Sequence, residues 1–120
     1  QARLDLNAVT HPFVLREIGA RIAQAEAEGA RAVALDVPLL FESGLDRACT
    51  ATCAVLAPED VSVGRIAERD GISPERARER LRAQPGDDFY TARCDAVLVN
   101  AGSRGEFLKK ARLCLQKYGR

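Results

Sequence analysis

The sequence predicts an α/β fold in which parallel strands alternate with helices. Three short apolar segments, at about residues 31–37, 52–56 and 95–99, lack the polar alternation of a strand with one wet face. Continuous apolar runs of this kind are typical of strands buried on both sides, as in parallel sheets. Helical periodicity separates the segments, which favours right-handed crossovers between them. We therefore expect a layered α/β fold with one core, for which 120 residues are enough.

The composition argues against several classes of protein. Hydrophobic residues make up 47% of the chain and charged residues 29%, which is ordinary for a globular protein. A net charge of +1 provides no general attraction for nucleic acid or an anionic membrane, and 5% aromatic residues offer few surfaces for base stacking. No apolar run approaches the ~20 residues that cross a bilayer. We predict no nucleic-acid or membrane partner and a cytoplasmic location.

The four cysteines are scattered along the chain. Only Cys49 and Cys53 are close, in a C-x3-C spacing, while Cys94, Cys114 and the single histidine are far away in sequence. We predict small, reduced thiols in a reducing cytoplasm, with neither a disulfide nor a metal site.

The N-terminal part is predicted to contain two helices. The first covers about residues 1–9, and His11-Pro12 ends it because the residue before a proline is driven out of the α region. Pro12 suits the first turn of a second helix, which Gly29 closes as a left-handed cap. That second helix carries an apolar stripe of Val14, Ile18, Ile22 and Ala25.

The segment that follows is the predicted organising strand, at about residues 31–37. Ligands of parallel sheets bind beyond the carboxyl ends of the strands, so Asp36 and Glu42 are expected at the functional edge. Asp36 would either orient a water on Mg²⁺ or cap local backbone. Glu42 would either contact a substrate or only tie its own loop.

The remaining elements follow from turn and capping signals. Acidic residues after Pro58 suit a helix start, Asp70-Gly71 suits a helix end, and Ser73 is a preferred N-cap. The predicted order is a loop at 43–47, a strand at 52–56, helices at 57–69 and 73–83, a helical turn at 87–93, a strand at 95–99, a loop at 100–103 and a helix at 106–117.

Arginines gather between the second and third predicted strands. Arg65 and Arg69 share one helix face, where like charges repel by roughly a few tenths of a kcal/mol unless something neutralises them. Guanidinium groups match phosphate oxygens, so this pair indicates either a phosphate site or a solvated face. In the next helix, i,i+3 spacing predicts ion pairs within the helix. These are Glu75 with Arg78 and Glu79 with Arg82.

Three other residues are candidates by position. His11 is either a catalytic base or a capping or packing residue. Asn100 and Gly102 follow the last strand, where exposed backbone suits a base or a phosphate. The chain contains no G-x-x-x-x-G-K-[ST] pattern, and its lysines all lie in the last helix, so no phosphate-cradling loop is predicted within it.

Several strings, taken together, resemble dephospho-CoA kinases. They are HP at 11–12, VPLLFESG at 37–44, APE at 57–59, RIAERDGIS at 65–73 and DAVLVNAGS at 95–103. The order and spacing match across essentially the whole chain. The resemblance implies a P-loop kinase-like three-layer fold with a parallel sheet and a helical lid at about residues 65–93. It makes residues 1–120 the C-terminal part of a single kinase domain.

The resemblance also implies a reaction and a set of site residues. The reaction is the last step of coenzyme A synthesis, in which ATP with Mg²⁺ phosphorylates the 3′-hydroxyl of dephospho-CoA. Arg65 matches the lid-base arginine that reaches the ATP phosphates and is the catalytic candidate. By position, the residues implied for ATP are Arg65, Arg69, Asn100 and Gly102. Those implied for the acceptor substrate are His11, Leu39, Leu40, Glu42 and Arg80.

The resemblance further implies parts that this sequence does not contain. The first strand of the family, its P-loop, its catalytic aspartate and most Mg²⁺ ligands would lie upstream, and Phe89-Tyr90 departs from the acid–base pair usual in the family. The absent strand would fill a gap of about 10 Å between the first two predicted strands. We expect the chain alone to be inactive until a missing N-terminal segment or another chain completes the sheet. A nucleoside monophosphate kinase-like enzyme and a non-catalytic α/β binding module are the alternatives.

Overall fold

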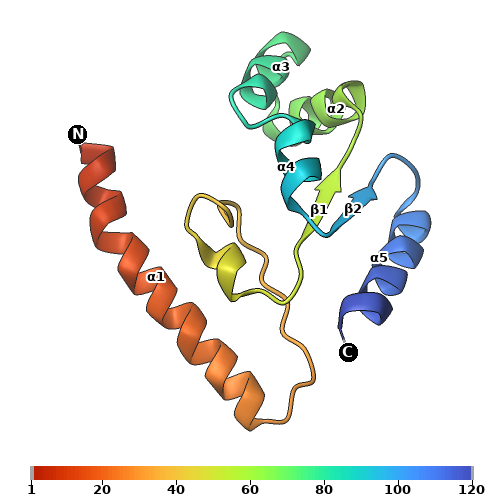
Figure 1. Cartoon of the computed structure of the whole chain (residues 1–120). Coiled ribbons are helices and arrows are strands. Elements are labelled where there is room, and N and C mark those ends of the chain that lie inside the picture. The colour runs from red at the N-terminus through yellow and green to blue at the C-terminus, as the bar shows by residue number, and fades with distance from the viewer. Residues whose placement is uncertain (1, 120) are drawn as a thin grey trace. The chain divides into compact units, whose positions relative to one another are not determined.

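The protein has an α/β fold with a small parallel sheet, as predicted (Figure 1). The computed structural model describes residues 2–119, and it describes side chains from residue 12 onward. The chain forms two compact units. One contains the N-terminal helix and the segment up to Val37, and the other spans Pro38–Tyr118. No helix in the described range is long and apolar enough to cross a membrane.

The N-terminal helix α1 (Ala2–Ala27) is uninterrupted, so the predicted break at His11-Pro12 is wrong. Pro12 lies inside the helix, where it removes only one backbone donor. Residues with good helix propensity on both sides sustain the remaining hydrogen bonds. The predicted cap at Gly29 is confirmed by its φ of 82° and by the bond from the Ala30 N–H to the Ala25 carbonyl at 2.9 Å.

Residues 31–37 form no strand, which corrects the prediction of a buried organising strand. A strand exists only where a neighbour completes its hydrogen bonds, and the sheet in the described chain consists of two other segments. Val33 is 44% exposed rather than buried, and Asp36 is exposed as well. The apolar composition of this segment therefore does not produce a strand without a partner.

The sheet lies in the second unit, where β1 (Cys53–Leu56) pairs in parallel with β2 (Ala96–Val99). Both strands and their parallel direction agree with the sequence prediction. Beyond β2, the N–H of Asn100 donates to the Leu56 carbonyl at 2.7 Å and extends the ladder. At the other end, the Thr52 N–H donates to the Asp95 carboxylate at 2.7 Å. Hydrogen bonds therefore continue the pairing of β1 and β2 beyond both ends of the strands.

Two helices form a corner after β1. The helix α2 (Glu59–Asp70) ends at Gly71, whose φ is 63°, and α3 (Pro74–Arg82) starts with the predicted Ser73 cap, which accepts from the Arg76 N–H at 3.3 Å. The two helices pack against each other, and Val63 on α2 and Ala77 on α3 are buried, with 4% and 0% exposure. Because Ala77 has only a methyl side chain, α3 can approach α2 closely. Their arginines are consequently positioned by this contact.

The remaining helices precede the sheet in the chain or pack against its strands. A 3-10 helix, η1 (Leu45–Ala48), precedes β1, and α4 (Asp87–Arg93) packs against β1. The last helix, α5 (Arg104–Tyr118), packs against β2 and begins two residues before the predicted start (Figure 1). Ser103 fixes that start, because its hydroxyl accepts from the Glu106 N–H at 3.2 Å.

Candidate functional site

The carboxyl end of β2 brings together two predicted site residues. Nη1 of Arg65, on α2, donates to the backbone carbonyl of Asn100 at 2.8 Å. Arg65 is exposed, and within the described part of the chain its guanidinium forms this one hydrogen bond. The arrangement places a fixed positive charge beside the segment that follows the sheet, at the edge where parallel sheets bind ligands.

A second cluster joins the ends of α2 and α3 through one carboxylate. Asp70 accepts two bonds from Arg69, Nε to Oδ1 at 2.8 Å and Nη2 to Oδ2 at 3.1 Å. Its Oδ2 also accepts from Nη1 of Arg80 at 2.7 Å. These interactions, led by the hydrogen bond from Arg69, hold the pKa of Asp70 below its ordinary value. Two predicted site residues, Arg69 and Arg80, are therefore neighbours.

The arginines of α3 pair differently from the prediction. Nε of Arg78 lies 3.2 Å from Oε1 of Glu59, and Nη2 of Arg82 lies 3.9 Å from the same oxygen. The predicted pairs with Glu75 and Glu79 within the helix are not formed. The packing of α3 across α2 brings Glu59 within reach of both long side chains, and this tertiary contact replaces the i,i+3 pairing.

The predicted substrate residues Leu39, Leu40 and Glu42 lie on one turn, at residues 38–44. The Ser43 hydroxyl donates to the Leu40 carbonyl at 3.0 Å, and the Ser43 N–H donates to the Leu39 carbonyl at 3.0 Å. Leu39 is 61% exposed, and Glu42 is exposed. Gly44 closes the turn with a φ of 78°, a conformation that suits glycine. The turn therefore presents Leu39 and Glu42 to solvent, whereas Leu40 is half-buried.

Aromatic contacts attach this turn to α4. The rings of Phe41 and Phe89 meet edge to face at 6.0 Å, and the guanidinium of Arg93 covers the Phe89 ring at 3.8 Å. Burial, followed by the charge of Glu42, raises the pKa of Tyr90. Phe89-Tyr90, where the sequence departs from the family pattern, thus forms the support of the turn.

Gly102, the remaining nucleotide candidate, lies under the side chain of Glu106. A side chain at position 102 would collide with the Glu106 carboxylate, which is the mobile end of a flexible residue. The bare glycine backbone therefore leaves space that a ligand could enter once Glu106 turns aside. The space beside Gly102 is near Asn100, which lies two residues earlier in the chain.

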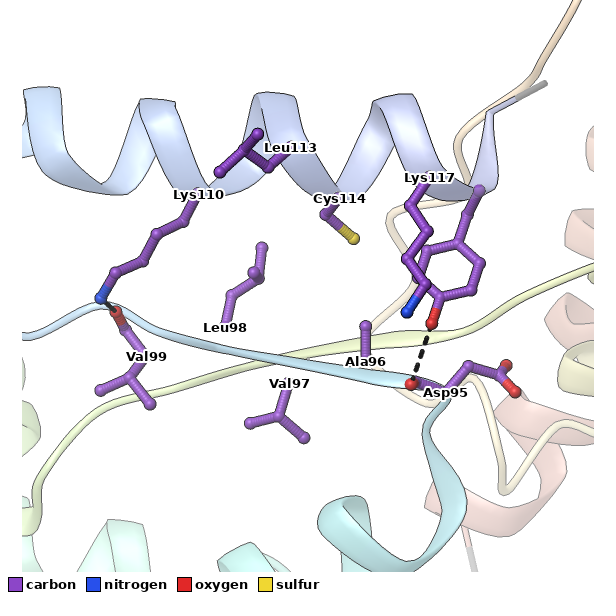
Figure 2. Close-up of a pocket in the computed structure, with 10 residues that line it drawn as sticks. Asp95, Ala96, Val97, Leu98, Val99, Lys110, Leu113, Cys114 and Lys117 are labelled. Atoms are coloured by element: carbon purple, nitrogen blue, oxygen red, sulfur yellow. Dashed lines mark hydrogen bonds between the residues drawn. The ribbon is translucent and has the colours of Figure 1, made fainter.

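A separate cavity of about 510 Å³ lies between β2 and α5 (Figure 2). Lys110 Nζ donates to the Val99 carbonyl at 3.0 Å, and the Tyr118 hydroxyl donates to the Asp95 carbonyl at 3.3 Å, one bond at each end. Its walls are mainly apolar. The lining residues are Asp95, Ala96, Val97, Leu98, Val99, Lys110, Leu113, Cys114, Lys117 and Tyr118. None of the predicted site residues is among them.

Thiols gather near this cavity. All four cysteines are free. Partial burial, a hydrogen bond and charge interaction with Cys114, and the charge of Cys94 raise the pKa of the Cys53 thiol to about 11. Burial also raises the pKa of Cys94. The thiols of Cys53 and Cys94 are consequently protonated at neutral pH.

The structure thus joins Arg65 with Asn100, and Arg69 with Arg80, among the predicted site residues. The turn that carries Leu39, Leu40 and Glu42 contacts α4 instead. The side chain of His11 lies outside the described residues. Sequence reasoning missed Asp70, although it directly follows Arg69, and missed Glu59, whose partners lie about 20 residues away. The Arg-Asp dipeptide was the available signal for Asp70.

Comparison with known proteins identifies the family. Residues 1–106 match the family described as CoaE, dephospho-CoA kinase. The dephospho-CoA kinase of Corynebacterium diphtheriae is 37% identical over 114 residues, which cover 95% of this chain and 57% of the relative. That of Symbiobacterium thermophilum is 41% identical over 101 residues, which cover 84% of this chain and 42% of the relative.

A solved structure agrees with these matches. The crystal structure of TT1252 from Thermus thermophilus superimposes with a TM-score of 0.76 at 33% identity, over 93% of this chain and 57% of that one. The chain therefore spans about half the length of the relatives that it matches. By its family match and by the identity of these relatives, the chain belongs to the dephospho-CoA kinase family.

Proposed function

We propose that this chain supplies the lid and the nucleoside-side loop of a kinase that transfers the γ-phosphoryl group of ATP to the 3′-hydroxyl of dephospho-CoA. Family membership supports the reaction. The observation that carries the proposal for this chain is the 2.8 Å hydrogen bond between Arg65 and the Asn100 carbonyl. It holds a cation at the carboxyl edge of the sheet, where the phosphates of a bound nucleotide would lie.

Arg65 would act by stabilising charge. Phosphoryl transfer depends mainly on positioning and on neutralising the oxygens of the transferred group. Arginine has five N–H donors in a rigid fork, and one bond to Asn100 leaves the others available for phosphate oxygens. Because the guanidinium is already held in place, less conformational freedom is lost when the nucleotide binds.

The other candidates have supporting roles in this proposal. Arg69 would meet the ATP phosphates from the lid, and Arg80, held beside it by Asp70, would contact both those phosphates and the acceptor. Asn100 and Gly102 would border the adenine, where the absence of a side chain at Gly102 permits close approach. The turn that carries the exposed Leu39 and Glu42 and the half-buried Leu40 would receive dephospho-CoA.

Mg²⁺ is expected with ATP, but the described residues offer no prepared site for it. Among them, no group of three His, Cys, Asp or Glu side chains is arranged to hold a metal ion. Mg²⁺ in kinases uses one or two carboxylates together with substrate phosphates and water. We therefore expect the protein ligands of the ion mainly outside this chain.

The proposal also requires further protein to complete the sheet. In the described chain β1 pairs with β2 alone, so its other edge carries no strand, and Val55 in β1 is 56% exposed. Unpaired strand edges and exposed apolar side chains favour association with another strand. An N-terminal segment with a phosphate-binding loop, or a second chain, would fill this position. We expect the 120-residue chain alone to be inactive.

A chimera tests the proposed function. The chain is joined to the segment of the Corynebacterium diphtheriae relative that it does not match, and ATP-dependent formation of coenzyme A is followed by mass spectrometry. The chimera should phosphorylate dephospho-CoA, whereas the chain alone should not. The intact relative serves as the positive control. Phosphorylation of AMP or UMP in place of dephospho-CoA, or turnover by the chain alone, would overturn the proposal.

A further inference from the structure

Asp70 is the shared hydrogen-bond acceptor of two arginines from different helices. Both of its oxygens face Arg69, and Oδ2 also accepts from Arg80, at distances between 2.7 and 3.1 Å. The two arginine side chains are 73% and 58% exposed, whereas that of Asp70 is only 25% exposed. The carboxylate is thus the covered centre of the cluster, and the arginines extend from it toward solvent.

The hydrogen bonds leave most of the arginine donors available. Arg69 uses Nε and one Nη2 hydrogen on Asp70, so both Nη1 hydrogens and one Nη2 hydrogen stay free of this contact. Arg80 uses only Nη1. Without the carboxylate, two like charges on long exposed side chains would repel and separate. Asp70 therefore keeps two guanidinium groups adjacent without consuming the donors that an anion needs.

Asp70 lies in the backbone at the corner between α2 and α3. It is the last residue of α2, and Gly71 follows in the left-handed conformation that lets the chain turn into α3. Arg69 belongs to α2 and Arg80 to α3, so the cluster spans the corner between the two helices. The spacing of the two cations is consequently set by this corner.

We propose that Asp70 is a positioning residue that holds Arg69 and Arg80 as a two-armed receptor for a polyphosphate. It acts through the arginines and does not itself contact the ligand. The inference rests on the proposed function for its ligand class, the phosphates of a nucleotide substrate. It goes beyond that function by assigning a role to the carboxylate of Asp70. By its charge alone this carboxylate would repel an anionic ligand, whereas through the two arginines it promotes binding.

Glu59 provides a matched control within the same pair of helices. It also lies on α2 and contacts two arginines of α3, Arg78 and Arg82. Loss of its charge should weaken the α2–α3 contact in the same manner, but it leaves the Asp70 cluster intact. A comparison of Asp70→Asn with Glu59→Gln therefore separates positioning of Arg69 and Arg80 from general support of the two helices.

The experiment titrates inorganic tripolyphosphate into the ¹⁵N-labelled 120-residue chain and follows the arginine Nε–Hε signals by NMR. In the unsubstituted chain, the ligand should shift the signals of Arg69 and Arg80. Asp70→Asn should weaken binding by about 10-fold and move the Arg69 signal before any ligand is added. Glu59→Gln should change the affinity by less than about 2-fold, and Asp70→Glu should bind with intermediate affinity.

Several results would overturn the inference. They are equal or tighter binding by Asp70→Asn, an equal loss in Glu59→Gln, and unchanged Arg69 and Arg80 signals in the unsubstituted chain. If Asp70→Asn does not fold, Asp70→Glu decides, because affinity equal to that of the unsubstituted chain would show that the carboxylate position is irrelevant. Tripolyphosphate binding does not require kinase activity. An inactive chimera would therefore refute the proposed function without affecting this result.

Discussion

The guanidinium of Arg65 and the backbone carbonyl of Asn100 are joined by a hydrogen bond of 2.8 Å. This bond links α2 to the segment that follows β2, although the residues are 35 positions apart in sequence. Asn100 is in turn fixed to the sheet, because its N–H donates to the Leu56 carbonyl at 2.7 Å. Arg65 is therefore oriented by the sheet, through Asn100. This favours a preorganised cation at this edge of the sheet.

Arg65→Ala should remove this cation and lower kcat in the active chimera by about 10²-fold or more. The negative charge on the transferred phosphoryl group would then lack the hydrogen-bond donor that stabilises it. Arg65→Lys keeps the charge but loses the planar fork, so it should recover only part of the rate. Steady-state kinetics with dephospho-CoA and ATP measure both variants. Near-normal turnover by Arg65→Ala would contradict the proposed role.

Gly71→Ala should destabilise the second unit by about 1 kcal/mol, because alanine is strained at the positive φ that ends α2. Gly64 is the matched control, since it lies inside the same helix and has open space where the Cβ of an alanine would lie. Gly64→Ala should instead stabilise the helix by roughly 0.5–1 kcal/mol. Urea denaturation followed by circular dichroism compares them, and effects of the same sign would refute the explanation.

The pH dependence of stability should report on Asp70. Hydrogen bonds and charge from Arg69 and Arg80 lower its pKa in the folded state relative to the unfolded chain. Its contribution to stability is therefore present above the unfolded pKa and disappears as the pH falls through the folded pKa. The Tm of Asp70→Asn should be below that of the unsubstituted chain near neutral pH, and the difference should vanish at low pH. A difference that is independent of pH would exclude this linkage.

The thiols should react according to their protonation. With a pKa of about 11, Cys53 has a thiolate fraction of about 10⁻⁴ at neutral pH, so iodoacetamide should label it slowly. Labelling followed by peptide mass spectrometry should accelerate as the pH rises toward that value. Cys114→Ala removes both the hydrogen bond and the neighbouring titratable thiol, so it should speed the reaction of Cys53. A rate unaffected by this substitution would refute the assigned cause.

Thiol titration under denaturing, non-reducing conditions provides a separate check on all four cysteines, which the structure holds as free thiols. The titration should count four thiols per chain. A lower count, or stoichiometric zinc by elemental analysis, would overturn the prediction of reduced and unligated cysteines.

The sequence by itself determined the features that depend on local chemistry. Apolar runs identified β1 and β2, and alternation with helices gave their parallel direction. Ser73 and Gly71 marked the corner between α2 and α3, because a hydroxyl at an N-cap and a glycine at a positive φ satisfy requirements of neighbouring backbone. The motif strings identified the family, since they preserve side chains at fixed spacing.

Only the tertiary structure decided which partners these residues have. Residues 31–37 have the composition of a strand, but a strand requires hydrogen bonds from a neighbour that a local pattern does not supply. Arg78 pairs with Glu59 and not with Glu75 of its own helix, because the packing of α3 on α2 places the Glu59 carboxylate within reach. Arg65 bonds to a backbone carbonyl, a group that every residue has, so no side-chain pattern could have indicated it.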